Sequence, residues 1–459
     1  MQRIYQQARL SRDRRFDGRF FVAVKTTGIF CRPICPANLP KEENIEYFQT
    51  AHQASEAGYR PCLRCRPDSA PGSCAWQGVM TTVRRAMNLL QQDMHSSVEA
   101  IAERLGIGER HLRQLFQREL GVSPKQYQLY ERLLFAKQLL QQSRLTVEHV
   151  AQASGFSSSR ALQANLHKRW QLSAGQLRHS TKYTEEEYLV LKLYFRPPYN
   201  WERVRDFWAM RAIPDVERVT EDSYSRFFEW MGESGWFEMR YMESKSCFEL
   251  RLHYGVHQYL KSVLENIRRM FDLDTDSEQI ASRIQSAGIG QKQLVQGLRI
   301  PGVWDCYEAG CRAILGQQIS VVAAVKLVSQ LTLELGKTSE SVSSNGAVGR
   351  YFPEPEAIVH SALDFLAMPG TRKEALRSFA QIFTADSSSR QTLNQQEWLS
   401  IKGVGPWTLS YASLRGLSEP DIWLSTDGVI KKVLQNHSID ADNAAPWRSY
   451  LTLNLWSMA

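Results

Sequence analysis

The sequence predicts a multidomain chain: a small α+β module with four cysteines, an all-α domain with two helix-turn-helix units, and an α+β domain followed by an all-α domain with a helix-hairpin-helix turn. Three observations support this prediction. Two close cysteine pairs lie within the first 65 residues, two similar helix-turn-helix patterns follow, and strand patterns give way to helical patterns in the second half. The 459 residues allow about three domains. We expect domains at residues 1–75, 79–181, 186–300 and 301–459.

The four cysteines of the first module have the spacing of a metal site. They form a Cys-x3-Cys pair, a gap of 26 residues and a Cys-x2-Cys pair: Cys31, Cys35, Cys62 and Cys65. Two such chelating pairs are what one tetrahedral zinc ion needs. Disulfides and scattered core cysteines are the alternatives, but the N-terminus is rich in Arg and Gln and has no apolar signal segment. We therefore expect one Zn²⁺ with four cysteine ligands in a cytoplasmic protein.

The basic residues are concentrated in the first part of the chain. Through Lys182 there are 27 Lys and Arg against 14 Asp and Glu, and the remainder has 29 against 34. This asymmetry indicates that the first part binds a polyanion, although a merely solvated basic surface is the alternative. No apolar run approaches the ~20 residues needed to cross a bilayer, so we expect no membrane partner. We expect a monomer.

Two helix-turn-helix patterns lie in this basic part. Residues 96–125 predict a short helix, a turn at Gly106 and a second helix that turns Leu112, Leu115 and Phe116 inward. Residues 145–170 repeat the pattern with a turn at Gly155. The second helix of such a unit can enter a major groove, where Arg and Gln read base edges. The outward residues of the first unit expected to contact DNA are Arg110, Arg113 and Gln114.

The helical region resembles the AraC-type DNA-binding domain through LRQLFQRELGVSPKQY, RLLFAKQLL and VAQASGF. The resemblance implies a transcription activator that binds promoter DNA, with RNA polymerase as a further partner. In the second unit RALQANL replaces the usual SYFxRxF, so its base-reading residues depart from the family pattern. A helical bundle without DNA contact is the alternative.

The first module resembles the N-terminal zinc domain of Ada alkylation-response proteins through DGRFFVAVKTT, GIFCRPICPA and AGYRPCLRCRPD. The resemblance implies that Cys31, a zinc ligand, accepts a methyl group from a DNA methylphosphotriester; without it, a structural role would be the better interpretation. A zinc ion with four thiolates has a formal charge of −2, and methylation of one sulfur changes this to −1. Weaker repulsion from DNA phosphates would then tighten DNA binding.

The second half begins with strand patterns in YLVLKLYF, WFEMRYM and CFELRLHY, and everything after Val303 is expected to be helical. The segment LSIKGVGPWTLSYASLRG places a glycine turn between two helices, a pattern whose backbone N–H groups can hold a DNA phosphate. Asp427 follows Trp407 by 20 residues. Its carboxylate could stabilise an oxocarbenium-like sugar as a base leaves, or it could simply cap a helix.

Residues 188–459 resemble AlkA-type 3-methyladenine DNA glycosylases through FRPPYNW, CRAILGQQISVVAAVKL, IKGVGPWTLSYASLRG, PDIWLSTDGVIKK and PWRSYLTLNLW. The resemblance implies that Asp427 is the catalytic carboxylate. It places a base pocket at four aromatic residues, whose rings would attract cationic alkylated purines but could instead be plain core: Phe207, Trp407, Tyr411 and Trp456. Related lyases carry a Schiff-base lysine where Trp407 stands, which implies hydrolysis without a covalent intermediate.

The same resemblance implies a set of DNA contacts at the hairpin and at a wedge loop: Gln318, Lys402, Gly403, Gly405 and Thr408. The chain departs from the family pattern at Gln318, where a leucine wedge can stand, at Lys402, where proline is usual, and at Ser457, where an aromatic residue is usual. It also lacks a Pro-Cys-His-Arg segment, and with it the base-demethylating domain of full Ada.

These resemblances imply a bacterial, nucleoid-associated fusion of an alkylation sensor with a glycosylase that acts on alkylated double-stranded DNA. A regulator whose glycosylase fold only binds damaged DNA is one alternative. A zinc and helical scaffold without DNA chemistry is the other.

Overall fold

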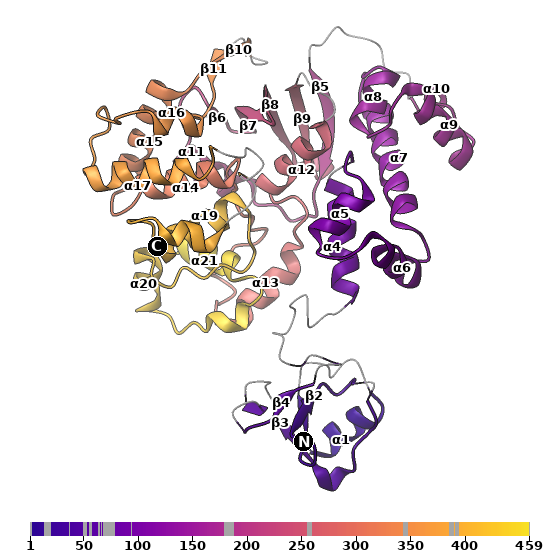
Figure 1. The fold of residues 1–459 in the computed structure, drawn as a ribbon. Coiled ribbons are helices and arrows are strands. Elements are labelled where there is room, and N and C mark those ends of the chain that lie inside the picture. The colour runs from indigo at the N-terminus through magenta and orange to yellow at the C-terminus, as the bar shows by residue number, and fades with distance from the viewer. Residues whose placement is uncertain are drawn as a thin grey trace. The chain divides into compact units, whose positions relative to one another are not determined.

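The computed structural model describes residues 2–12, 20–35, 37–48, 53–54, 57–62, 65, 67, 79–92, 94–178, 188–254, 259–342, 348–384, 390 and 394–458. The chain divides into two compact units, Met1–Glu131 and Arg132–Ala459. Figure 1 follows the elements in chain order, with the cysteine module in indigo and the C-terminal helices in yellow. None of the described helices is long and apolar enough to span a membrane.

The cysteine module consists of helix α1 (Gln2–Leu10), a four-stranded sheet and the short 3-10 helix η2 (Glu42–Asn44). Its strand order is β3-β1-β2-β4. The strands are β1 (Phe21–Val24), β2 (Ile29–Cys31), β3 (Ile45–Phe48) and β4 (Arg60–Pro61). β1 pairs antiparallel with β2 and β3, whereas β2 and β4 are parallel. Arg9 is buried and joins α1 to this sheet through Glu42, the Pro40 carbonyl and the Tyr47 hydroxyl.

The first helix-turn-helix unit consists of α4 (Val79–Gln92), α5 (Val98–Arg104) and α6 (Glu109–Leu120). Leu112, Leu115 and Phe116 are buried in the core of the three helices, as their spacing predicts. Ser97 caps α5 by accepting a hydrogen bond from the Ala100 N–H. The turn after α5 needs Gly106, whose φ of +69° is in the left-handed region.

The second unit follows the long helix α7 (Pro124–Gln142), which includes the predicted linking segment. It consists of α8 (Val147–Ala153), α9 (Ser159–Trp170) and the short α10 (Ala174–Leu177). Thr146 and Ser158 cap α8 and α9 through their hydroxyl groups. Gly155 has a φ of +75° at the predicted turn.

A five-stranded antiparallel sheet opens the second half, in the order β5-β9-β8-β7-β6. Its strands are β5 (Leu189–Tyr194), β6 (Glu217–Val219), β7 (Ser223–Trp230), β8 (Glu233–Met242) and β9 (Cys247–Tyr254). The three predicted strands correspond to β5, β8 and β9, while β6 and β7 were not anticipated. Three helical segments accompany the sheet: α11 (Trp201–Ala209), η3 (Glu243–Lys245) and α12 (Leu260–Met270).

The remaining chain is mainly helical. Its helices are α13 (Ser277–Ser286), α14 (Cys306–Leu315), α15 (Val321–Leu335), α16 (Pro355–Val359), α17 (Gly370–Gln381), α18 (Gln395–Ser400), α19 (Pro406–Gly416), α20 (Gly428–Leu434), η6 (Ala441–Ala444) and α21 (Arg448–Trp456). The expectation that everything after Val303 is helical is wrong at one place, because β10 (Thr338–Val342) and β11 (Val348–Arg350) form a two-stranded sheet. The polar sequence of β10 lacks the apolar alternation by which strands are recognised.

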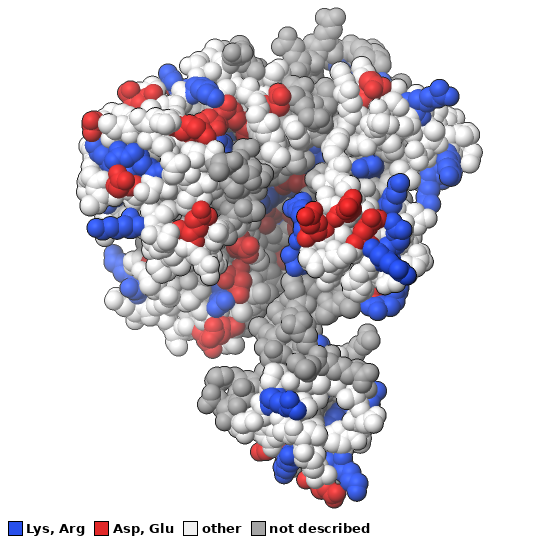
Figure 2. Space-filling view, in the orientation of Figure 1, with Lys and Arg blue, Asp and Glu red and all other residues white. Residues whose placement is uncertain are grey.

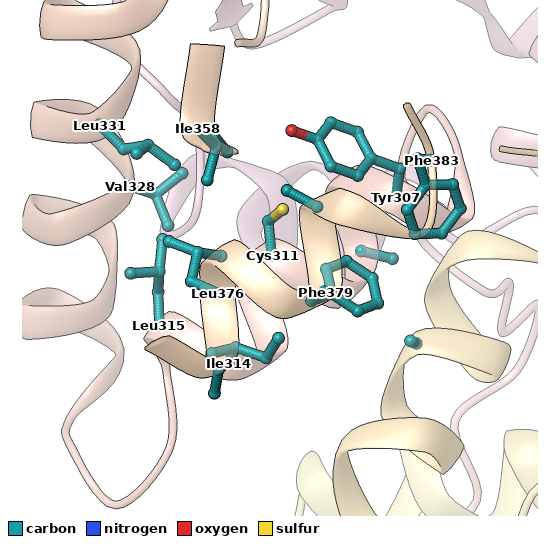
Figure 3. Packing of buried hydrophobic residues seen from close by; sticks show 14 of the residues in the cluster. Tyr307, Cys311, Ile314, Leu315, Val328, Leu331, Ile358, Leu376, Phe379 and Phe383 are labelled. Atoms are coloured by element: carbon teal, nitrogen blue, oxygen red, sulfur yellow. The ribbon is translucent and has the colours of Figure 1, made fainter. Parts of the chain in front are cut away.

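Two buried cores support the site region. One centres on α14, where Tyr307, Cys311 and Ile314 meet residues of α15 and α17, as Figure 3 shows. Gly310 is required there, because a Cβ atom at this position would lie 2.1 Å from Phe379 Cζ. The other core joins α13 to α19, α20 and α21. The segment 277–300 therefore packs with the C-terminal helices, although the sequence pattern groups it with the preceding α+β domain.

Candidate metal centre and candidate active site

The four cysteines of the first module converge. Their Sγ atoms all lie within 4.8 Å of one another. Cys31 ends β2, and the parallel pairing of β2 with β4 brings Cys62 beside it, with the Cys62 N–H donating to the Phe30 carbonyl at 3.0 Å. Cys35 is buried and the other three are partly buried. The predicted quartet is thus a single cluster of the size that one tetrahedral metal ion requires.

The electrostatics of the cluster fit a divalent cation. Hydrogen bonds from Cys31 and Cys65 lower the pKa of Cys35 to about 2, while the contact with Cys35 raises the pKa of Cys31 above its usual range. Four adjacent thiols cannot all ionise side by side, because thiolates repel one another. A bound cation removes this limit and holds all four as thiolates. The cluster holds one Zn²⁺, and its ligands are Cys31, Cys35, Cys62 and Cys65.

The sulfur atoms differ in their backbone contacts. The Arg32 N–H donates to Cys65 Sγ at 3.3 Å, and the backbone at Ala37 donates to Cys35. Among the described residues, neither Cys31 nor Cys62 receives such a bond from a backbone N–H. Because N–H···S bonds stabilise the charge on a thiolate, they lower the nucleophilicity of Cys35 and Cys65.

The predicted DNA-reading residues of the first helix-turn-helix unit lie on one exposed face of α6. Arg110, Arg113 and Gln114 are exposed, and Arg113 forms an ion pair with Glu109 at 2.6 Å. Figure 2 shows Lys and Arg side chains on the outer surface of the helical region that contains α6 and α9. This face offers donors for phosphates and base edges.

The predicted hairpin joins α18 to α19. Gly403 adopts a φ of +97°, and both Gly403 and Lys402 are exposed, while Gly405 caps α19. Thr408 is only 2 % exposed, and its hydroxyl accepts a hydrogen bond from Gln317 at 2.9 Å. Its side chain therefore acts within the protein and does not face solvent.

Gln317 connects this hairpin to the predicted wedge loop. Its amide also donates to the Gly403 carbonyl at 2.9 Å. The next residue, Gln318, is exposed and has a φ of +58° in the left-handed region. Such a backbone is strained for a residue other than glycine, so the surrounding structure must hold Gln318 in this exposed conformation.

Asp427 accepts four hydrogen bonds in the structure. It caps α20 by accepting the N–H groups of Val429 and Ile430 at 3.0 and 3.2 Å. It also accepts the indole N–H groups of Trp407 and Trp456, each at 3.2 Å. Four donors hold the carboxylate in a fixed position. The helix-cap interpretation of Asp427 is thus confirmed, and its catalytic role stays a prediction.

A cavity of about 500 Å³ opens beside Asp427, and this volume lies in the range of small-molecule sites. All four predicted pocket aromatics line it, together with Ser457. Trp407 stacks on Tyr411 at 5.2 Å between ring centroids, and Phe207 lies parallel to Trp456 at 6.2 Å. The structure brings Phe207, from a helix about 200 residues earlier in the chain, to the residues of α19 and α21.

Two arginines of this wall, Arg211 and Arg415, were not predicted from the sequence. A signal existed for Arg415, which follows Tyr411 by four residues on α19, a spacing that places both on one helix face, whereas Arg211 lies just beyond the end of α11. Both guanidinium groups lie over the Phe207 ring, 3.7 and 4.6 Å from its centroid.

Three family models match the chain. They are the metal-binding domain of Ada over residues 4–68, a helix-turn-helix domain over 101–180 and the AlkA N-terminal domain over 190–305. The matches follow the order of the cysteine module, the helical region and the α+β domain.

Relatives of known description match the whole chain or its halves. The "probable bifunctional transcriptional activator/DNA repair enzyme AlkA" of Mycobacterium tuberculosis is 30% identical over 97% of this chain and 94% of that protein. "DNA-3-methyladenine glycosylase 2" of Escherichia coli is 28% identical over 58% of this chain and 95% of its own length. The "bifunctional transcriptional activator/DNA repair enzyme Ada" of Escherichia coli is 34% identical over 38% of this chain and 48% of its own length.

Proposed function

Because the chain belongs to the family of bifunctional transcriptional activator/DNA repair enzymes of the AlkA type, we propose that it joins three activities on alkylated DNA. Cys31 accepts a methyl group from a DNA methylphosphotriester. The helix-turn-helix units direct transcription activation at promoter DNA, with RNA polymerase as a partner. The C-terminal half excises alkylated purines such as 3-methyladenine by hydrolysis that depends on Asp427.

The observation that carries the excision proposal is the setting of Asp427. Its carboxylate lies in the wall of the cavity with the four pocket aromatics. With four N–H donors on its oxygens, it is a fixed anion and a weakened nucleophile. Such a group suits electrostatic stabilisation of positive charge on the sugar as the base departs. Water then adds to the sugar, and because Trp407 is not an amine, no Schiff base forms.

The methyl transfer rests on Cys31. Its thiolate attacks the methyl carbon, the carbon–oxygen bond of the phosphotriester breaks, and the electron pair stays on the phosphate oxygen of the restored diester. The product sulfur is a thioether, so each chain acts once. The backbone N–H bonds to Cys35 and Cys65 support this assignment, because they lower the reactivity of two of the other three ligands.

Excision is tested by Asp427→Asn in the full-length protein. Asparagine can still cap α20, so the variant removes the charge and retains the helix. We expect release of free 3-methyladenine from methylated DNA to fall by at least about a hundredfold, the scale of losing one charge-stabilising group. Asp440, which caps η6 through the Asp442 N–H, supplies the matched control Asp440→Asn. Release by Asp427→Asn at the control rate would contradict the catalytic assignment of Asp427, whereas no release by the unaltered protein would favour the alternative, a regulator whose glycosylase fold only binds damaged DNA.

A further inference from the structure

A short loop between α14 and α15 lies at the opening of the aromatic-lined cavity. Gly316 ends α14, and Ser320 caps α15 through its hydroxyl group. We call residues 316–320 the wedge loop. Its Ile319 lines the cavity and is 37 % exposed, so the loop lies where a base would enter from DNA.

Gln317 joins this loop to the hairpin through its side-chain amide. Its Nε2 atom lies 2.9 Å from the Gly403 carbonyl oxygen and 2.9 Å from the Thr408 hydroxyl oxygen. A carbonyl oxygen only accepts hydrogen bonds, so the amide NH₂ group must face it, and this group has one donor for each partner. Among the described residues, no other hydrogen bond joins the wedge loop to the hairpin.

The two partners of Gln317 lie at positions that bear on DNA binding and on the reaction. Gly403 is the left-handed residue of the hairpin turn that is expected to hold a phosphate. Thr408 is buried in the first turn of α19, directly after Trp407, whose indole donates to Asp427. One amide therefore joins the wedge loop both to the hairpin and to the helix turn beside the carboxylate.

The bonds of Gln317 explain the unusual backbone of the next residue. Gln318 is exposed with a φ of +58°, and a residue other than glycine keeps such a conformation only where its surroundings enforce it. The hairpin holds Gln317 before it, and the cap of α15 holds Ser320 after it. The loop therefore presents Gln318, with the exposed apolar side chain of Ile319 beside it, as a preformed projection at the cavity.

Resting on the proposed excision of flipped bases, we propose that Gln317 is a positioning residue that couples the hairpin to the wedge loop. When the hairpin binds a phosphate, the two bonds of Gln317 place Gln318 at the space that a flipped base leaves in the duplex. Filling this space opposes the return of the base to the stack. Without the two bonds, Gln318 is free to leave the left-handed conformation, and the same phosphate contact no longer positions it.

The test uses a DNA probe that requires no excision. A duplex carries a tetrahydrofuran abasic-site analogue opposite 2-aminopurine, whose fluorescence reports filling of the gap, and the full-length protein concentration at half of the fluorescence change is measured. Gln317→Met retains the length of the side chain but donates no hydrogen bond, so we expect this concentration to rise about fivefold, the scale of one net hydrogen bond. Gln318→Ala should also raise it, but the double variant should bind no more weakly than the weaker single variant, because the two residues act as one unit.

Gln381→Met is the matched control, because it removes a glutamine–threonine hydrogen bond of 3.0 Å, to Thr384, at the exposed end of α17, and its titration should equal that of the unaltered protein. Effects of Gln317→Met and Gln318→Ala that multiply in the double variant would overturn the inference. A Gln317→Met titration equal to that of the unaltered protein, or no fluorescence change with the unaltered protein, would overturn it as well. Failure of the unaltered protein to release any methylated base, with the expected fluorescence results intact, would contradict the proposed function alone.

Discussion

Asp427 links two indole side chains to one carboxylate. Trp407 and Trp456 each donate an N–H group to a different oxygen of Asp427 while their rings line the cavity. The aromatic wall and the position of the Asp427 carboxylate therefore depend on the same two residues. This coupling explains why tryptophan is suited to both positions, since phenylalanine would supply the ring without the hydrogen bond.

The pairing predicts the effect of Trp456→Phe. The variant retains a ring but removes one donor to Asp427, so we expect excision of 3-methyladenine to slow by about tenfold, in line with a hydrogen bond to a charged group. Trp447→Phe is the control, because the Trp447 indole N–H has no acceptor among the described residues. Equal rates for the two variants would show that the indole N–H has no part in the reaction.

For single residues, the sequence predicts which residues form the sites better than it predicts the contacts between them. The cysteine quartet comes together as its spacing predicts, and the four pocket aromatics line one cavity as the family resemblance implies. Arg211 and Arg415 were missed because their significance arises only when α11 and α19 meet at Phe207. The roles of all these residues in catalysis and DNA binding stay predictions.

The elements around the cavity are held by a buried ionic network. Glu217 of β6, Arg226 of β7, and Glu308 and Arg312 of α14 form ion pairs of 2.6 to 3.4 Å, and all four side chains are at most 12 % exposed. Arg312 also donates to the Arg211 carbonyl at 2.8 Å. The network therefore fixes the edge of the sheet and the end of α11 against the helix that supports the pocket.

Glu308→Gln tests the network. Removal of one charge leaves Arg226 and Arg312 partly uncompensated, so we expect a loss of about 3 kcal/mol in the free energy of unfolding. Urea unfolding followed by tryptophan fluorescence is a suitable measurement, because 11 of the 12 tryptophans lie at or after Trp170. Glu374→Gln, which removes an exposed ion pair with Arg377, should cost about 0.5 kcal/mol or less. A similar small loss for Glu308→Gln would contradict the structural role.

The network also explains why strands β6 and β7 could not be predicted from the sequence pattern. β6 has only three residues, and the core strand β7 carries Arg226 among its apolar residues, so neither shows a clear alternation. An arginine in a strand interior is acceptable only when partners such as Glu308 arrive from elsewhere in the chain. β10 was missed for a related reason, since its buried Ser339 is bonded to the Tyr351 hydroxyl at 2.8 Å.

The whole molecule combines two chemistries that respond to one class of damage. The first is the zinc thiolate cluster in the first unit, and the second is the cavity beside Asp427 in the second unit. Acceptance of one methyl group reduces the negative charge of the cluster by one. Under the proposed methyl transfer, this change would weaken its repulsion from DNA phosphates and tighten DNA binding.

The order of domains was predictable from the sequence because each carries a compact local pattern. The expected boundary at residue 300 does not follow the packing, since α13 shares a core with α19 to α21 although it precedes residue 300. Packing between segments far apart in the chain decides this grouping, and such packing leaves little trace in local periodicity.

The central claim is that one chain carries two independent repair activities. It is tested most directly by one reaction in which the products of both activities are measured. Full-length protein is mixed with DNA that contains methylphosphotriesters and methylated purines; peptide mass spectrometry then measures methylation at Cys31 and chromatography measures free 3-methyladenine. We expect the unaltered protein to give both signals, Asp427→Asn to give only the Cys31 methylation, and Cys31→Ser to give only the free base. Methylation on a different cysteine, or full base release by Asp427→Asn, would contradict the account.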